Sequence, residues 1–186
     1  LRSLCIEMDA RYELMSKAEV SKITLYNDKY RDRHLLPTEG HHFLPYIVTV
    51  IDEYADLVMS SGAGGEDRKL ANSISKSIIR LAQKGRAAGI HIVLATQRPS
   101  VDIITGIIKA NFPTRIAFRV FSRTDSQTIL DKTGAETLIG RGDMIYYAGA
   151  ELVRVQCALI ESGEISAITK EIASQTGYKK SYNVPY

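Results

Sequence analysis

The chain has 186 residues, of which 45% are hydrophobic and 24% charged, and its formal net charge is +3. This length is enough for one well-buried domain and too short for two large ones. The mild positive charge permits contact with a polyanion without requiring it, and no apolar run approaches the ~18 residues of a membrane span, so we expect no membrane contact by this segment.

The first 45 residues predict two helices and a loop. Apolar side chains at helical spacing indicate a helix over residues 1–18, and Ser21 is a candidate cap for a second helix. Charged residues and two prolines indicate a loop over residues 31–45. Because the chain starts at Leu1 inside a helical pattern, without Met or a signal peptide, we expect it to be a fragment of a longer protein.

A strand that ends in two carboxylates follows. Residues 47–51 are all β-branched, which suits a strand buried on both faces of a parallel sheet. Asp52 and Glu53 come directly after it, at the strand end where open α/β sheets bind ligands. P-loop nucleotide hydrolases use such a pair, the Asp to help hold Mg²⁺ and the Glu to orient or deprotonate the attacking water. The alternative is an acidic helix N-terminus that the helix dipole favours.

Further elements alternate between helix and strand. Residues 60–65 indicate a flexible loop, residues 66–88 a long helix that Gly89 ends, and residues 91–95 a second buried strand. This alternation predicts a parallel sheet with right-handed crossovers, with an antiparallel hairpin at one edge. The later elements are expected as a short helix over 101–110, a third strand over 115–120, helical segments over 125–132 and 135–139, a hairpin over 143–147 and 152–159, a closing helix over 164–175, and a loose tail.

The phosphate-binding P-loop is absent from the sequence. Its pattern of Gly, four residues, and then Gly-Lys-Ser/Thr occurs nowhere, and the glycines at 62–65 lack the Lys-Ser/Thr. Either the P-loop precedes Leu1 in a longer chain, or the protein is not a nucleotidase.

Several long segments resemble the motor domain of the FtsK/SpoIIIE family. The members of this family are hexameric, ATP-driven translocases of double-stranded DNA in bacteria. The run from Ile51 to Leu57 resembles the Walker B segment of this family. The family's Walker A segment is expected before Leu1. The other matching segments are residues 8–16, 86–91, 94–100, 102–111, 113–118, 128–131, 134–136 and 142–144, so the resemblance covers most of the chain up to about residue 159.

This resemblance implies an α/β fold with a RecA-like P-loop NTPase core, a mainly parallel sheet, flanking helices and a late antiparallel hairpin. It implies that residues 1–45 form an N-terminal helical segment and loop, residues 46–160 the ATPase core, and residues 161–186 a C-terminal helix and tail. It also implies a cytoplasmic motor segment of a protein anchored in the bacterial inner membrane, which acts with ATP and Mg²⁺ in chromosome segregation and cell division.

The resemblance also assigns roles at the nucleotide site. Asp52 matches the Walker B aspartate and would act on Mg²⁺, through water. Glu53 matches the catalytic glutamate. Gln97 looks like the sensor residue, because its amide can donate to a γ-phosphate and accept from the attacking water. The alternative for Gln97 is a loop glutamine that bonds to backbone. Thr96 is expected to support Gln97 at the nucleotide, or merely to end the strand.

Arginines are expected to act between subunits of a homo-oligomeric ring, which the resemblance implies is hexameric. Arg115 resembles the finger that stabilises the transferred phosphoryl group in the neighbouring subunit, and Arg86 is the second choice. For double-stranded DNA, the candidates are Arg123, Gln127 and Arg154, mostly through phosphate contacts. Each of these three could instead be an ordinary surface residue.

Two other functions remain open. One is a related ring ATPase of secretion or conjugation, and the other is a non-catalytic interaction module that has lost nucleotide binding. The fragment alone is predicted to hydrolyse no ATP, because the P-loop contacts to the β- and γ-phosphates are missing.

Overall fold

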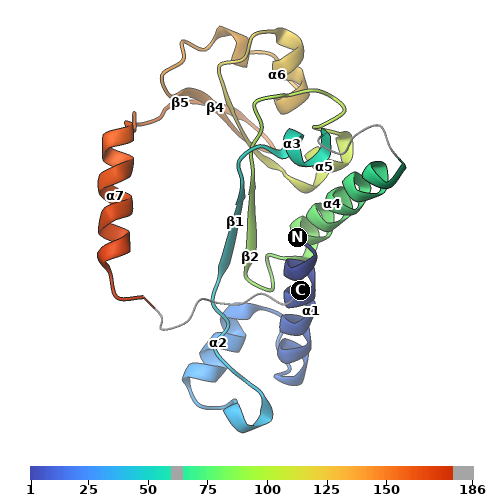
Figure 1. The fold of residues 1–186 in the computed structure, drawn as a ribbon, viewed down its shortest axis with the longest axis vertical. Coiled ribbons are helices and arrows are strands. Elements are labelled where there is room, and N and C mark those ends of the chain that lie inside the picture. Colours follow the sequence, from blue (N-terminus) through green and yellow to red (C-terminus); the bar gives the residue numbers. More distant parts are fainter. Residues whose placement is uncertain (60–64, 178–186) are drawn as a thin grey trace. The chain divides into compact units, whose positions relative to one another are not determined.

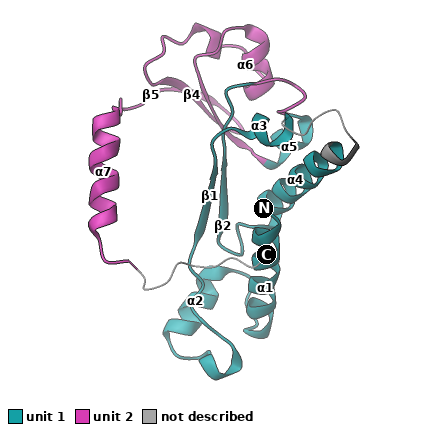
Figure 2. Cartoon of the chain, in the orientation of Figure 1, with its two compact units in different colours: residues 1–98, 105–111, 184–186 teal, residues 99–104, 112–183 magenta. Residues whose placement is uncertain are grey.

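The computed structural model describes residues 1–59 and 65–177. Within them the chain forms two compact units (Figure 2). Unit 1 comprises residues 1–98 and 105–111, and unit 2 comprises residues 99–104 and 112–177. The predicted tail and most of the predicted loop at 60–65 lie outside the described residues.

Unit 1 is a helical region followed by a two-stranded parallel sheet (Figure 1). The predicted helices and strands of this part are present in their predicted order, and the structure adds a short helix, α3, directly after the first strand. Its elements are α1 (Arg2–Lys17), α2 (Ile23–Arg31), the short 3-10 helix η1 (Pro37–Glu39), β1 (Ile47–Ile51), α3 (Tyr54–Met59), α4 (Gly65–Lys84), β2 (Ile90–Leu94) and α5 (Gly106–Asn111).

The strands β1 and β2 pair in parallel, from Ile47 opposite Ile90 to Ile51 opposite Leu94. One face of this sheet packs on the core of unit 1, which includes the buried side chains of α1, α2 and α4. On the other face Val48 is 65% exposed. The expectation of burial on both faces is therefore wrong for the part of the chain that the structure describes, because no element there covers the second face.

Several element boundaries differ from their predicted positions, and the helix expected over 101–110 starts only at Gly106. Ser21 does not cap α2, which starts after Lys22 with no side-chain cap. Gly89 does not end α4, because this helix already stops at Lys84. Gly89 lies in the turn before β2, where its φ of 74° favours glycine and where a Cβ atom would clash with Ile23. Helix α6 (Arg123–Leu130) starts before the predicted Asp125, because Ser122 and Asp125 form a reciprocal capping box.

Unit 2 is built on an antiparallel sheet of order β3-β4-β5. The hairpin of β4 and β5 confirms its prediction, but β3 was expected in the parallel sheet and instead pairs antiparallel with β4. The alternation in β3 of the buried Ala117 with the exposed Ile116 and Phe118 is typical of antiparallel strands with one covered face. The elements are β3 (Thr114–Phe118), α6, the 3-10 helix η2 (Ala135–Thr137), β4 (Asp143–Ala148), β5 (Leu152–Gln156) and α7 (Ser162–Ser174).

A buried arginine connects three segments of unit 1. Arg11 of α1 bonds to Glu7 at 2.8 Å, and its Nη1 donates to the carbonyl oxygens of Pro45 at 2.7 Å and Ala88 at 2.9 Å. Its side chain is 1% exposed. Since Pro45 precedes β1 and Ala88 precedes β2, this guanidinium holds α1 against the start of both strands.

No helix among the described residues is long and apolar enough to span a membrane. This agrees with the absence of a long apolar run in the sequence.

We expect Arg11→Met to lower the free energy of unfolding by about 3–5 kcal/mol, because it leaves a buried carboxylate and two carbonyl groups without their donor. Urea unfolding followed by circular dichroism measures this loss. The control is Arg31→Met, whose guanidinium is 65% exposed beside Asp28 and whose replacement should change stability by less than about 1 kcal/mol. Equal losses in the two variants would show that Arg11 is not an anchor of unit 1.

Candidate functional site

The parallel register of β1 and β2 brings two chain segments together at the C-terminal edge of the sheet. Beyond the last strand pair, the backbone NH of Ala95 donates to Ile51 at 2.9 Å, and the NH of Tyr54 donates to Ala95 at 2.8 Å. The strands therefore stay in register up to the residues with predicted functions. Asp52 and Glu53 follow β1, and Thr96 and Gln97 lie just beyond the end of β2.

The carboxylate of Glu53 joins these two segments. Its Oε1 accepts hydrogen bonds from the hydroxyl of Thr96 at 2.5 Å and from the backbone NH of Ala55 at 3.0 Å. Its Oε2 accepts from the backbone NH of Gln97 at 2.7 Å. The NH of Arg98 in turn donates to the Thr96 hydroxyl at 3.1 Å. The structure thus brings together Glu53, Thr96 and Gln97, which the sequence assigned to one nucleotide site, through hydrogen bonds that the sequence did not predict. Ala55 and Arg98 also join these contacts.

These contacts stabilise the ionised form of Glu53. Burial by itself would raise the pKa of this carboxyl group, but the hydrogen bonds from Thr96, Gln97 and Ala55, together with the positive charge of Arg98, lower the pKa below its ordinary value of 4.5. Glu53 is therefore ionised at neutral pH. A carboxylate has about four acceptor positions, and three are occupied here, which leaves one on Oε2.

Asp52 has a different environment. Its side chain is exposed, and no described residue forms a hydrogen bond or an ion pair with it. Carboxylate oxygen is a ligand that Mg²⁺ prefers, and this ion keeps several waters and phosphate oxygens instead of an all-protein cage. The described residues contain no group of three or more His, Cys, Asp or Glu side chains that could hold a metal. Asp52 therefore fits Mg²⁺ held by one carboxylate plus water and phosphate.

The side chain of Gln97 takes no part in the Glu53 contacts. It is exposed, and only its backbone NH bonds to Glu53. The geometry thus leaves the amide available to a ligand, and its role as a sensor stays a prediction.

Arg115 is firmly held within unit 2. Its Nη1 lies 2.7 Å from Asp131 and 3.1 Å from the carbonyl oxygen of Ile129, and its Nε donates to Phe112. The guanidinium also lies over the ring of Tyr147, and its side chain is 15% exposed. These contacts orient the side chain rigidly, and its action on a neighbouring subunit stays a prediction.

The three candidates for DNA contact all lie in unit 2. Arg123 and Gln127 are exposed one turn apart on α6, and Arg123 is 3.6 Å from Glu136. Arg154 of β5 instead makes two hydrogen bonds to Asp143, at 2.6 and 2.9 Å. That bidentate pair lowers the pKa of Asp143 from 3.8 to about 2, with help from the backbone NH of Ile139. Contact with DNA by Arg154 would therefore compete with this ion pair.

Comparison with known proteins identifies the family. The family model for FtsK/SpoIIIE matches residues 1–101. The chain belongs to the FtsK/SpoIIIE family. It is 46% identical over 177 residues to the DNA translocase FtsK of Oceanobacillus iheyensis and 47% identical over 177 residues to the DNA translocase SpoIIIE of Bacillus subtilis. These matches cover 94% of this chain but only 22% and 21% of the relatives, so the chain spans about a fifth of their length.

Solved structures of a conjugation coupling protein and of a secretion ATPase share the fold of this family member. The conjugation coupling protein TcpA, solved as a monomer with ATPγS, superimposes with a TM-score of 0.77 at 29% identity, over 92% of this chain and 47% of TcpA. The cytoplasmic domain of the type VII secretion ATPase EccC from Thermomonospora curvata gives a TM-score of 0.71 at 21% identity, over 99% of this chain and 20% of EccC. The predicted α/β class with an ATPase-type core is confirmed.

We expect Thr96→Val to raise the pKa of Glu53, because it removes the hydroxyl donor and keeps the side-chain shape. NMR titration of the Glu53 carboxyl carbon measures the shift, and Thr49→Val in β1 is the control. Since the folded pKa is depressed, the stabilisation by Glu53 is present above pH 4.5 and is lost as the pH falls through the folded pKa. The variant should lose less stability over that acid range, and an unchanged pKa would contradict the assigned contact.

We expect Asp143→Asn to destabilise unit 2 at neutral pH, because the pairing of Arg154 with a carboxylate is lost. The folded pKa of about 2 lies below the ordinary 3.8, so the wild-type contribution is complete above about pH 4 and disappears towards pH 2. Amide hydrogen exchange in β4 and β5 should therefore differ between wild type and variant at pH 7 and converge near pH 2. Asp28→Asn, which removes an exposed partner of Arg31, should leave these amides unchanged. A constant difference over the whole range would exclude this titration.

Proposed function

We propose that this chain is part of the motor of an ATP-driven translocase of double-stranded DNA. Membership of the FtsK/SpoIIIE family supports this function, and one structural observation carries it: Glu53, held by the ends of two parallel strands, stands beside the exposed Asp52. P-loop enzymes that hydrolyse nucleotides use one residue to position the attacking water and an aspartate that helps to hold Mg²⁺, and Glu53 and Asp52 fit these two roles.

The proposed chemistry follows from the different surroundings of the two acids. Glu53 is ionised and keeps one acceptor position, which would accept a hydrogen bond from the attacking water and orient it. Its lowered pKa makes it a weak base, so we assign it mainly to orienting the water and less to removing its proton. Asp52 would hold Mg²⁺ through water, and the bound ion would neutralise charge on the ATP phosphates.

Other residues would complete the site across a ring of copies. Thr96 would fix Glu53, and the exposed amide of Gln97 would meet the γ-phosphate. Arg115 would act on the nucleotide of the neighbouring subunit as an arginine finger. Its hydrogen bonds to Ile129 and Asp131 fix the orientation of its side chain, as this role requires. Arg123, Gln127 and Arg154 would contact DNA phosphates without reading the sequence.

The role of the complete protein is also a proposal. We infer a hexameric ring that acts in chromosome segregation and cell division, with this segment on the cytoplasmic side of a protein anchored in the inner membrane. The P-loop would lie before Leu1, so the chain by itself would hydrolyse no ATP. The division into residues 1–45, 46–160 and 161–186 stays part of this proposal.

A second candidate is a ring ATPase of conjugation or secretion. The similarity to TcpA, which is a conjugation coupling protein, supports this alternative. ATPase activity of the full-length protein discriminates between them: stimulation by duplex DNA supports the duplex translocase, whereas stimulation by single-stranded DNA alone supports the alternative. No ATPase activity under any condition would support a non-catalytic module.

We expect Glu53→Gln in the full-length protein to lower the DNA-stimulated kcat for ATP about 100-fold or more, because the neutral amide orients and polarises water poorly. Steady-state phosphate release measures kcat, and binding of a fluorescent ATP analogue should persist. The control is Glu39→Gln, in the exposed turn η1, which should keep wild-type turnover. A kcat within tenfold of wild type in Glu53→Gln would refute the assigned role.

A further inference from the structure

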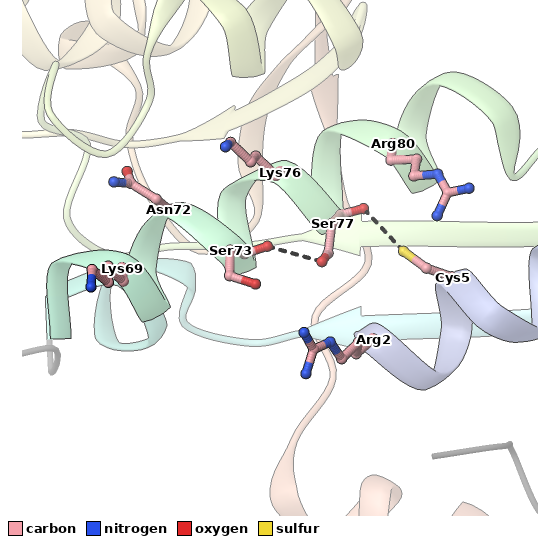
Figure 3. Close-up of a pocket in the computed structure, with 8 residues that line it drawn as sticks. All are labelled: Arg2, Cys5, Lys69, Asn72, Ser73, Lys76, Ser77 and Arg80. Atoms are coloured by element: carbon pink, nitrogen blue, oxygen red, sulfur yellow. Dashed lines mark hydrogen bonds between the residues drawn. The ribbon is translucent and has the colours of Figure 1, made fainter. Parts of the chain in front are cut away.

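A groove of about 460 Å³ lies between α1 and α4 in unit 1 (Figure 3). It does not include any residue of the candidate nucleotide site. Two of the residues that line it come from α1, and six come from α4. They are Arg2, Cys5, Lys69, Asn72, Ser73, Lys76, Ser77 and Arg80.

The sequence of α4 explains why one face of this helix is polar. The six α4 residues in the groove recur at intervals of three or four positions, which places them on one side of a helix. Ile78 and Leu81 on another side of α4 are 0% and 1% exposed in the core. Packing of these apolar side chains therefore fixes the rotation of α4 and turns its polar residues towards the groove. On the α1 side, Cys5 contacts the carbonyl oxygen of Ser77 (Figure 3).

The residues that line this groove carry positive charge. Four of the eight lining residues are cations, and none of the eight is an acid. Arg80 is paired with Asp9, at 2.8 Å. Among the described residues no acid forms an ion pair with Arg2, Lys69 or Lys76, whose side chains are exposed. The groove therefore attracts an anion.

The length and the polar groups of the groove indicate which kind of anion. From Lys69 to Arg80 the helix rises about 16 Å, which is far longer than one phosphate group and equals the rise of roughly five nucleotides along the axis of duplex DNA. Lysine, arginine, serine and asparagine side chains are the usual contacts to the phosphates and sugars of DNA. We propose that the α1–α4 groove binds the sugar–phosphate backbone of DNA, as a contact separate from Arg123, Gln127 and Arg154.

The test is binding of a labelled, random-sequence DNA duplex to the full-length protein without nucleotide, measured by fluorescence anisotropy over a series of salt concentrations. The variant combines Arg2→Gln, Lys69→Gln and Lys76→Gln. Each lost phosphate contact lowers the slope of log affinity against log salt by about 0.9, so the slope should fall by about 2–3. The matched control removes three charges outside the groove, with Lys17→Gln, Lys22→Gln and Arg33→Gln, and should keep the wild-type slope.

A second variant tests the same groove without removing a cation. Ser73→Glu places a carboxylate among Lys69, Lys76 and Arg80 at an exposed helical position, and it should weaken duplex binding in the same salt-dependent way. Circular dichroism checks that both variants fold.

The outcomes separate this inference from the proposed function. If wild type and both groove variants bind DNA with the same slope, the groove proposal is overturned while the translocase proposal stands. If the groove variants instead change the oligomeric mass and leave the slope unchanged, the groove meets an acidic protein surface, and the DNA proposal is also wrong. If the wild type binds no duplex, both proposals fail. Glu53→Gln should retain full duplex binding, because Glu53 lies outside the groove.

Discussion

The parallel pairing of β1 with β2 is the constraint on which the candidate site depends. It sets Ile51 opposite Leu94, so the residues after each strand emerge at one edge. Glu53 then bonds to Thr96 and Gln97, which lie more than 40 positions later in the chain. A slip in this register would move the donors away from the carboxylate and raise the pKa of Glu53. Arg11 supports the same pairing from the opposite ends of the strands, through Pro45 and Ala88.

Ion pairs in unit 2 limit what its arginines can do. Arg115 is bound to Asp131 and to backbone carbonyl groups, and Arg154 is bound to Asp143. A guanidinium that serves a second partner must leave or share its first, so the energy of these pairs opposes contact with a nucleotide or with DNA. Arg123 is 83% exposed with its nearest acid at 3.6 Å, so it is the least restrained of the three.

Helix α4 links the apolar core of unit 1 to a charged surface. Its buried side chains pack against the strands and α1, whereas its polar residues, at helical spacing, line the α1–α4 groove. One side of α4 thus stabilises the core of unit 1, and another side presents positively charged residues to the groove. If both proposals hold, unit 1 contributes the acids for ATP hydrolysis and a groove that binds the sugar–phosphate backbone of DNA. The contacts predicted in unit 2 would then add to DNA binding.

The sequence by itself determined the local features of this protein. The run of β-branched residues before Asp52 and Glu53, the order of helices and strands, the late hairpin and the family were all readable, because side-chain periodicity and motifs are properties of neighbouring residues. The assignment of Glu53, Thr96 and Gln97 to one nucleotide site agrees with the rule that ligands bind at the carboxyl ends of parallel strands.

Only the tertiary structure decided the non-local features. It showed β3 in an antiparallel sheet, Val48 exposed, Arg11 buried, Arg154 paired with Asp143, and a groove between α1 and α4. Alternation of elements does not specify which strand pairs with which, and charge counts do not say which arginine meets which acid. Those outcomes depend on contacts between distant segments, and they follow from how the whole chain packs.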